Sequence, residues 1–539
     1  DLGPSGMGSG HIHNRWAQAA ARWGPQMQAI GLRYYRATST GWSQVEPEQG
    51  KFDWKGLDAH SRYLKEHGFV FGGLLNGGVK WNTLDKPGTL PVNNLAAWSN
   101  YVFEVVQHSK ADIKRWEIWN QTAADYAKIV IAAYDAAKKA DPSCLIGLAA
   151  KSAHIQYLEQ AIIAGAKDHF DYITLHPYEV LDGIASNKGT ESVFMHIVPT
   201  LRKMLRAQNP AKADVPVIFT ELGCDAVKKG ADSQAHALIK AYTMGIAQGV
   251  ECIQWFEGKD GDSGPLSLLD RKGIPRPAYG AMARMIEHLG QDPKYLGWAL
   301  LKDQHYAFAF QGAKSTVLIT WAYRGGKDEL LFPQPITLLN PINGDFSSTN
   351  ALSLTQAPVL ILGIPDALLH SAEANKTKPL TWEGDYSKSE SVSITMDGQQ
   401  IESGLHTLSG EAVAGAVLAY GGSARAGNVP GGNVFVVDPE FLSYTSVPIE
   451  ITAVVRRNEN KDNAGFKLVY ESTTGLKTAK SGWFTVPADE KWHTVRWQID
   501  DAQFVNYWGY NFALESDGNQ FNRYYLQSVT VTKRSPTPN

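Results

Sequence analysis

Short apolar runs alternate with longer amphipathic stretches from the start of the chain to about residue 290. A short apolar run bounded by turn residues is typical of a buried strand, and apolar residues three and four positions apart are typical of a helix that covers it. Strands and helices in strict alternation pack as a parallel sheet with the helices outside it. This alternation constrains the fold more than any other feature of the sequence.

Seven of the runs are expected to form strands, at residues 30–36, 69–75, 115–120, 144–150, 170–178, 215–223 and 251–258. Helical patterns separate them, for example at residues 16–29, 94–108, 122–140 and 232–248. An eighth strand near the N-terminus is indistinct. About 290 residues suit eight such units, so we predict a TIM-type (β/α)₈ barrel over residues 1–290. A doubly wound open sheet is the alternative, but no glycine-rich phosphate loop opens a helix after any strand.

The pattern changes after residue 290, and at 539 residues the chain is too long for one hydrophobic core. Residues 291–370 contain short alternating strands broken by Gly, Pro and Asn, which predicts a small antiparallel β-domain. Residues 371–385 are polar and lack periodicity, as a linker does. Residues 386–539 are again strand-like and predict a larger, jelly-roll β-sandwich.

The charge of the chain excludes some partners. The formal net charge is −3, and no Lys/Arg-rich run indicates binding to nucleic acid or to an anionic membrane. No apolar run reaches the length of a membrane-spanning helix. The 16 tryptophans and 22 tyrosines are compatible with core packing and also with stacking on sugar rings.

The three cysteines, Cys144, Cys224 and Cys252, are odd in number and have no metal-ligand spacing. We expect them to be small buried residues on core strands, and we expect neither a metal nor a cofactor. The chain begins at Asp1 without a signal segment. We expect a secreted or periplasmic protein from which an export signal has been removed.

Two of the expected strands end in residues that can do chemistry. In the segment WEIWNQ, Asn120 and Gln121 follow a strand and precede a helix. In the segment FTELG, Glu221 closes a strongly apolar strand. Catalytic residues of barrels gather at this end of the strands. A buried glutamate is costly unless it is hydrogen-bonded or functional, so an ion-paired structural residue is the alternative for Glu221.

These motifs resemble those of the clan A glycoside hydrolases, in which strand 4 ends in Trp-x-x-Trp-Asn-Glu and strand 7 ends in Glu. Residues 42–54, WSQVEPEQGKFDW, resemble the loop that follows the clan's second strand. Residues 171–178 resemble its sixth strand, Trp255 the end of its eighth, and residues 276–279 the end of its barrel. The resemblance covers about residues 30–285. Family 39, whose members add a β-domain after the barrel, has the most similar organisation.

The resemblance implies hydrolysis of β-linked polysaccharides or oligosaccharides with retention of configuration. Enzymes of this kind hold two carboxyl groups about 5–5.5 Å apart, one as nucleophile and one as acid/base. Glu221 matches the nucleophile. Position 121 matches the acid/base, but Gln121 stands there, and an amide cannot deliver or take a proton at neutral pH. Loss of the acid/base lowers the rate by about 10²- to 10⁴-fold.

Three explanations for Gln121 stay open. The residue is a Glu→Gln substitution introduced to hold an intact substrate, or the barrel is catalytically dead and serves as a carbohydrate-binding protein. In the third, another carboxylate takes over the proton transfer, and the candidates are Glu117, Glu179 and Glu257. For an active enzyme we expect endo action on a β-glycan, with an exo-acting β-glycosidase as the alternative.

The resemblance also implies substrate contacts. Asn120 matches the residue that contacts the sugar 2-hydroxyl, and Arg36 matches the arginine that binds the nucleophile and lowers its pKa. His176 and Tyr178 match residues that line the nucleophile, and Trp255 matches the floor of the sugar subsite.

Weaker candidates for the sugar subsites follow expected strands and comprise Trp42, Asn76 and Trp81. In the sandwich, Tyr507, Trp508 and Tyr510 could stack on sugar, as in a carbohydrate-binding module. A purely structural sandwich is the alternative, with Trp483, Trp492 and Trp497 in its core.

Overall fold

The computed structural model describes most of the chain, namely residues 2–5, 15–86, 89–119, 123–150, 152–187, 190–261, 263–302, 305–322, 328–380, 385–397, 401–407, 417–419, 422–427, 433–457, 464–489, 491–506, 509–516 and 524–535. Two compact units are present. The first comprises Asp1–Ser186 with Leu201–Thr377, and the second comprises Asn187–Thr200 with Lys378–Asn539. No helix within the described ranges is both long and apolar enough to cross a membrane.

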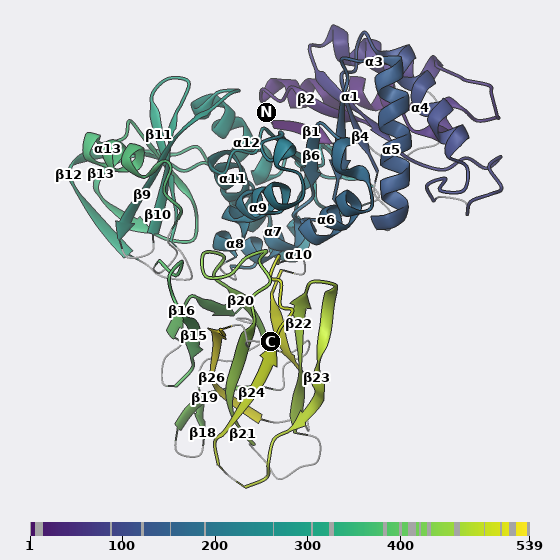
Figure 1. Ribbon diagram of the computed structural model, residues 1–539. Helices are drawn as coiled ribbons and strands as arrows, with labels where there is room; N and C mark the ends of the chain where they lie inside the picture. Colours follow the sequence, from purple (N-terminus) through teal and green to yellow (C-terminus); the bar gives the residue numbers. More distant parts are fainter. Residues whose placement is uncertain are drawn as a thin grey trace. The chain divides into compact units, whose positions relative to one another are not determined.

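Eight parallel strands form a closed barrel in the order β1 to β8, as Figure 1 shows. The eighth strand, which is indistinct in the sequence, is β1, and it pairs with β8 and β2 to close the barrel. The predicted fold class is therefore confirmed. The strands are β1 Leu2–Ser5, β2 Tyr34–Ala37, β3 Val70–Leu75, β4 Arg115–Ile118, β5 Leu145–Ala149, β6 Tyr172–Leu175, β7 Val217–Leu222 and β8 Cys252–Phe256.

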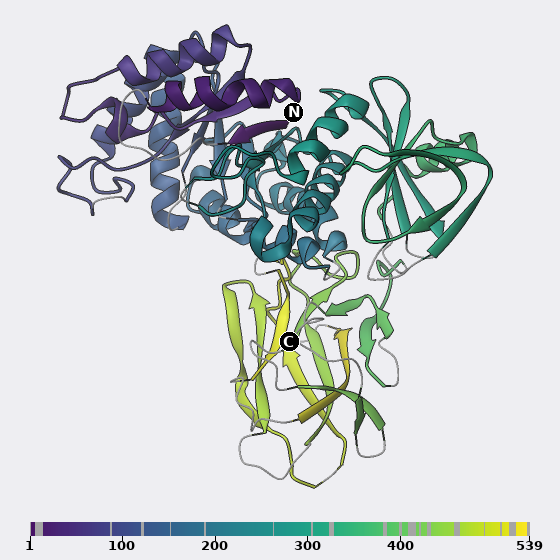
Figure 2. The same cartoon turned by 180° about the vertical axis from the view of Figure 1, so that it is seen from behind.

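Helices surround these strands (Figure 1; seen from behind in Figure 2). Two of them begin with ordinary helix-start residues: the Asn94 side chain accepts the Ala97 amide at the start of α4, and Pro277 opens α12. The longer helices are α1 Arg15–Ala29, α3 Lys55–Glu66, α4 Leu95–Ser109, α5 Ala123–Ala140, α6 Ile155–Ile163, α9 Ile197–Gln208, α11 Ala231–Ala247 and α12 Pro277–Leu289. Shorter ones are α2 Trp42–Val45, η1 Ala166–Asp168, α7 Tyr178–Ala185, η2 Pro210–Lys212 and α10 Ala226–Lys229. Helix α8, Glu191–Met195, belongs to the second unit.

The interior of the barrel is built in layers, because alternate residues of each strand point inward. The lowest layer is apolar and contains Tyr172, Ile218 and Cys252 packed against Tyr34 and Leu145. The Tyr172 ring fits because strand β5 has a glycine beside it. A Cβ at Gly147 would lie 2.5 Å from that ring.

The next inward layer, two residues closer to the carboxyl ends of the strands, is polar and buried. It contains Arg36, Glu117, Thr174, Thr220 and Gln254. Polar side chains at this depth need partners, and within this layer Arg36 donates two hydrogen bonds to Glu117.

An antiparallel six-stranded sheet in the order β13-β12-β14-β11-β10-β9 follows the barrel. Helix α13 packs against it through Leu368, Leu369 and Ala372. Part of the stretch expected to be an irregular linker is therefore helical, because this Ala- and Leu-containing segment has an apolar side to bury. The elements are β9 Lys294–Lys302, β10 His305–Gln311, β11 Thr316–Thr320, β12 Asp328–Leu339, β13 Phe346–Leu354, β14 Val359–Leu362 and α13 Asp366–Asn375.

The second unit is a sandwich of two antiparallel sheets, one of seven strands and one of five in the order β17-β20-β25-β22-β23. Side chains from both sheets meet in one hydrophobic core. The strands are β15 Ser391–Thr395, β16 Ile401–Ser403, β17 Leu405–Thr407, β18 Val417–Ala419, β19 Gly422–Ala426, β20 Asn433–Val437, β21 Ile449–Arg457, β22 Gly465–Ser472, β23 Gly475–Thr485, β24 His493–Ile499, β25 Phe512–Glu515 and β26 Tyr524–Lys533.

The aromatic residues of the sandwich partly differ from the expectation. Trp497 lies in the core as expected, but Trp483 is 40% exposed on the edge strand β23, so its assignment to the core is wrong. Tyr510 is half-buried. Tyr507 and Trp508 lie outside the described residues.

Candidate active site

Arg36, Glu117 and Glu221 meet near the carboxyl ends of β2, β4 and β7. The Arg36 guanidinium donates from Nε to Glu117 Oε2 at 3.1 Å and from Nη2 to Glu117 Oε1 at 2.7 Å. From Nη1 it donates to Glu221 Oε1. Arg36 and Glu117 are buried, whereas the Glu221 side chain keeps 21% of its surface exposed. One cation therefore holds two carboxylates, of which Glu221 is the one open to solvent.

The second oxygen of Glu221 is held from the other side. The Tyr178 hydroxyl donates to Glu221 Oε2 at 3.2 Å. His176 Nδ1 lies 3.9 Å from the same oxygen, and His176 Nε2 lies 2.9 Å from Thr220 Oγ1. Burial and the Glu221 charge raise the pKa of Tyr178, so its phenol remains a donor. The Glu221 carboxylate is thus fixed in one orientation.

An irregularity in β7 turns Glu221 into the barrel. The β7–β8 pairing runs from Phe219 opposite Ile253 to Leu222 opposite Trp255, three steps along β7 against two along β8. The extra residue is a β-bulge, which re-aims side chains and is common next to active sites. It lets Thr220 and Glu221, which are adjacent in sequence, both face the same site.

Electrostatics keep both carboxylates ionised. Burial raises the pKa of Glu221, but the charges of His176 and Arg36 lower it by more, so the pKa lies below its ordinary value; the Glu117 charge acts in the opposite direction. For Glu117, burial is outweighed mainly by Arg36 and His176, which hold its pKa at about 2. Because both pKa values are depressed, the charges are present at neutral pH and are lost only as the pH falls through the lowered values.

The aromatic residue beside this cluster is Phe256, and the assignment of Trp255 to the subsite floor is contradicted. Trp255 is 1% exposed, and its indole N–H donates to Leu266 O at 2.9 Å. Inward residues of β8 alternate, so Trp255 has the outward parity and Phe256 the inward one. Phe256 is half-buried, and its ring centroid lies 6.5 Å from that of Tyr178. In the sequence, the polar residue Gln254 within this apolar strand could have marked the inward face, on which Phe256, two residues later, also lies.

Trp42 also differs from the expectation. It is fully buried, stacks on Tyr101, and donates from its indole N–H to Glu46 Oε2 at 2.6 Å. It therefore supports the loop and has no surface for a sugar. Trp81 and Asn76 are half-buried beside it; Trp81 meets the Trp42 ring edge-on, and the Asn76 carbonyl accepts the Trp42 amide at 3.0 Å.

Asn120 and Gln121 lie outside the described residues, which resume at Ala123 with helix α5. Before them, β4 ends at Ile118 and the Trp119 amide donates to Leu75 O at 3.0 Å. Position 121 therefore follows strand β4 by three residues, as the sequence motif requires.

The three carboxylates considered as replacement acids have other partners. Glu117 is tied to Arg36 and its pKa of about 2 leaves it without a proton to give. Glu179 accepts a hydrogen bond from the Ser152 hydroxyl. Glu257 is buried and accepts the Gly261 amide at 3.1 Å. Within the described ranges, no three His, Cys, Asp or Glu side chains are grouped as a metal would need.

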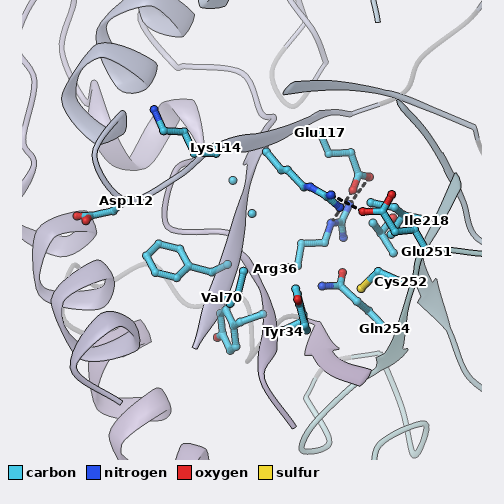
Figure 3. A pocket seen from close by; sticks show the side chains of 16 residues that line it. Tyr34, Arg36, Val70, Asp112, Lys114, Glu117, Ile218, Glu251, Cys252 and Gln254 are labelled. Atoms are coloured by element: carbon cyan, nitrogen blue, oxygen red, sulfur yellow. Dashed lines mark hydrogen bonds and ion pairs between the residues drawn. The ribbon is translucent and has the colours of Figure 1, made fainter. Parts of the chain in front are cut away.

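A cavity of about 310 Å³ adjoins Arg36 and Glu117, and Figure 3 shows the side chains that line it. Its lining includes first residues of strands, such as Tyr34, Val70 and Arg115, so it lies toward the amino-terminal end of the barrel. Arg36 and Glu117 form its upper wall. The cavity therefore reaches Arg36 and Glu117 from the amino-terminal end of the barrel, and Glu221 does not line it.

The closed barrel with its cluster at the carboxyl end has the fold of the clan A glycoside hydrolases. A family model described as β-galactosidase, of glycoside hydrolase family 42, matches residues 12–71. A search of curated proteins gave no match.

Family 39 is represented among the similar structures. A family 39 glycoside hydrolase from the gut symbiont Bacteroides cellulosilyticus WH2 has a TM-score of 0.56 and 17% identity, covering 68% of this chain and 81% of that chain. At this identity the likeness shows a shared fold. An exo-β-1,4-mannosidase from Opitutaceae bacterium strain TAV5 has a TM-score of 0.42 and 17% identity, over 52% of this chain and 58% of that one. Xylanase 10B from Thermotoga maritima has a TM-score of 0.39 and 16% identity, over 53% and 94%. Nothing further rests on the last two.

Proposed function

We propose that this chain is a retaining glycoside hydrolase for β-linked glycans, with Glu221 as nucleophile and Gln121 at the acid/base position. The observation that carries the proposal is the state of Glu221. Its carboxylate is ionised, partly exposed and held through both oxygens by Arg36 and Tyr178 at the carboxyl end of the barrel. Catalytic groups of barrel enzymes occupy this end.

The reaction proceeds in two displacements. Glu221 attacks the anomeric carbon, the glycosidic C–O bond breaks, and its electron pair goes to the leaving oxygen, which normally takes a proton from the acid/base residue. Gln121 has no proton to transfer. This chain can therefore be glycosylated only by substrates with leaving groups that depart as stable anions. The second displacement also needs a base to activate water, so the glycosyl-enzyme of this chain accumulates.

Endo action on a polymer is the proposed mode. Two β-structured regions follow the barrel, and appended domains of this kind suit a polymeric substrate better than a small glycoside. A polymer is met outside the cell, so a secreted or periplasmic location belongs to the same proposal.

A carbohydrate-binding protein on a barrel without catalysis is the second candidate. The observation that favours it is Gln121 itself, since an amide preserves the shape of glutamate and its hydrogen bonds but cannot act as an acid.

Covalent labelling tests the nucleophile in this chain as it stands. Incubation with a panel of 2,4-dinitrophenyl β-glycosides of monosaccharides and disaccharides is expected to add one glycosyl unit to Glu221, detected by mass spectrometry of the peptides. Azide, which needs no base, should release the sugar as the β-glycosyl azide. Glu221→Gln is the control and should stay unlabelled. No adduct with any sugar, or an adduct on another residue, contradicts the proposal.

Substitutions on β8 test which aromatic side chain faces the sugar. Phe256→Ala is expected to weaken oligosaccharide binding about 3- to 10-fold, because a stacking contact is lost, without a large change in stability. Trp255→Phe is the matched control: it should leave binding within about twofold but lower the free energy of unfolding by about 1–3 kcal/mol, since it replaces the buried indole with a smaller ring and removes its hydrogen bond. Calorimetric titration and urea unfolding measure the two effects. If Trp255→Phe weakens binding and Phe256→Ala does not, Trp255 forms the floor of the subsite after all.

A further inference from the structure

The Arg36 guanidinium binds its two carboxylates unequally. Two of its N–H groups contact Glu117, at 3.1 and 2.7 Å, and one contacts Glu221. Glu117 is 3% exposed, and it lies between the guanidinium and His176 Nε2, which is 3.7 Å from Glu117 Oε1. Figure 3 shows Arg36 and Glu117 joined by dashed lines at the wall of the cavity. Glu117 therefore forms the more buried half of this cluster and the half that makes more hydrogen bonds to Arg36.

The charge on the two carboxylates differs during the proposed reaction. When Glu221 Oε bonds to the anomeric carbon, its negative charge is consumed and a neutral ester forms, while the leaving oxygen carries away the electron pair. Arg36 stays protonated, because its pKa is raised by its two carboxylates despite the opposing effect of burial. A buried cation that loses its counter-charge is strongly unfavourable. Only a second carboxylate can balance Arg36 in the covalent intermediate.

We propose that Glu117 is a positioning residue that acts as the permanent counter-ion of Arg36, so that Glu221 can give up its charge to the sugar without leaving the guanidinium unbalanced. This inference rests on the proposed function of Glu221. It assigns a role to a residue that does not touch the reacting atoms and that could otherwise be taken for a structural ion pair or a replacement acid.

A second consequence is electrostatic. With Glu117 ionised, the three groups Arg36, Glu117 and Glu221 carry one net negative charge before the reaction and none after it. Relative to the same cluster without the Glu117 charge, this favours the positive charge that develops on the sugar in the transition state. The Glu117 charge also raises the pKa of Glu221 and makes it a better nucleophile.

Other titratable groups face the same cluster and stay in place in the test below. They are Tyr172 from β6, His176 directly after β6, Tyr126 from α5, Tyr178 from α7 and Glu257 after β8.

Glu117→Gln tests the counter-ion, because it keeps the size of the side chain and removes its charge. In the chain with Gln121, the rate of covalent labelling by a 2,4-dinitrophenyl β-glycoside is expected to fall about 10²-fold at neutral pH. At low pH the labelling rate falls as Glu221 becomes protonated, and we call this part of the pH–rate profile the acid limb. Its midpoint should shift to lower pH by on the order of one unit, because Glu221 loses a neighbour that raises its pKa. Thr174→Val, a buried change in the same layer, is the matched control and should leave rate and acid limb unchanged.

Glu117→Asp keeps the charge but shortens the reach to Arg36. It is expected to lose part of the rate while its acid limb stays with that of the parent chain, and it keeps the test available if Glu117→Gln does not fold. An unchanged rate in Glu117→Gln overturns the proposal, as does a slower rate with an unmoved acid limb, or an acid limb that moves in Glu117→Asp. Absence of labelling in the parent chain is a different result: it removes the proposed function, and this inference with it.

Discussion

Gln121→Glu is expected to raise the rate of hydrolysis of unactivated β-glycans by about 10²- to 10⁴-fold, which is the usual contribution of general acid/base catalysis. The new carboxyl group would protonate the leaving oxygen in the first displacement and remove a proton from water in the second. The barrel provides the rest of the site already, since Glu221 is ionised and oriented. Release of reducing ends from a panel of β-glucans, galactans, xylans and mannans measures the gain and names the sugar.

Leaving-group dependence gives this prediction its internal control. The gain in the first displacement should be small for dinitrophenyl glycosides, whose leaving group needs no proton, and large for natural linkages. Gln121→Ala removes the amide without adding an acid and should give no gain at all. If Gln121→Glu stays inactive on the whole panel while Glu221 can still be labelled, the explanation of Gln121 as an introduced substitution fails. The carbohydrate-binding role then accounts for the chain better.

Glu221→Ala, made together with Gln121→Glu, is expected to lower hydrolysis roughly 10⁴-fold or more, as loss of the nucleophile does in other double-displacement enzymes. The carboxylate is the only group that forms the covalent bond, and no described neighbour can replace it, because Glu117 remains tied to Arg36. Azide, entering the space that the side chain leaves, should restore part of the turnover of an activated β-glycoside. The product should be the α-glycosyl azide, of opposite configuration to the one formed when Glu221 is present.

The matched control is Glu251→Gln. Glu251 immediately precedes β8 at the amino-terminal end of the barrel, where it pairs with Arg115 at the surface. Exposed pairs of this kind contribute little to stability, so hydrolysis should stay within about twofold. Hydrolysis by the Glu221→Ala variant within tenfold of its parent would exclude Glu221 as the nucleophile.

Much of the site could be predicted from strand ends. Glu221 was expected from the end of its apolar strand, and the family resemblance implied Arg36, His176 and Tyr178 beside it; the carboxyl ends of parallel strands in a closed barrel meet at one edge. Residues more than a hundred positions apart in the sequence were therefore expected to meet, and the structure brings these four together.

Strand parity explains two of the residues that were misplaced, and burial of a connecting segment explains the third. Trp255 and Phe256 are neighbours, and a shift of one residue reverses which of them faces inward. Trp42 is the first residue of the short helix α2, and the packing of this helix buries it against Tyr101. Trp483 and Phe484 on β23 are likewise neighbours, and Phe484 packs against the sandwich core while Trp483 has the outward parity.

The amino-acid sequence by itself determined the barrel, the β-structured regions after it and the strand ends that carry the chemistry. Hydrophobic periodicity sets which segments form strands and helices, and parallel pairing then brings those ends together. Only the tertiary structure decided that a bulge turns both Thr220 and Glu221 inward, that Phe256 rather than Trp255 lies beside the site, and that Glu117 shares Arg36 with Glu221. Each of these depends on register and on contacts between distant strands, and local sequence patterns do not encode either.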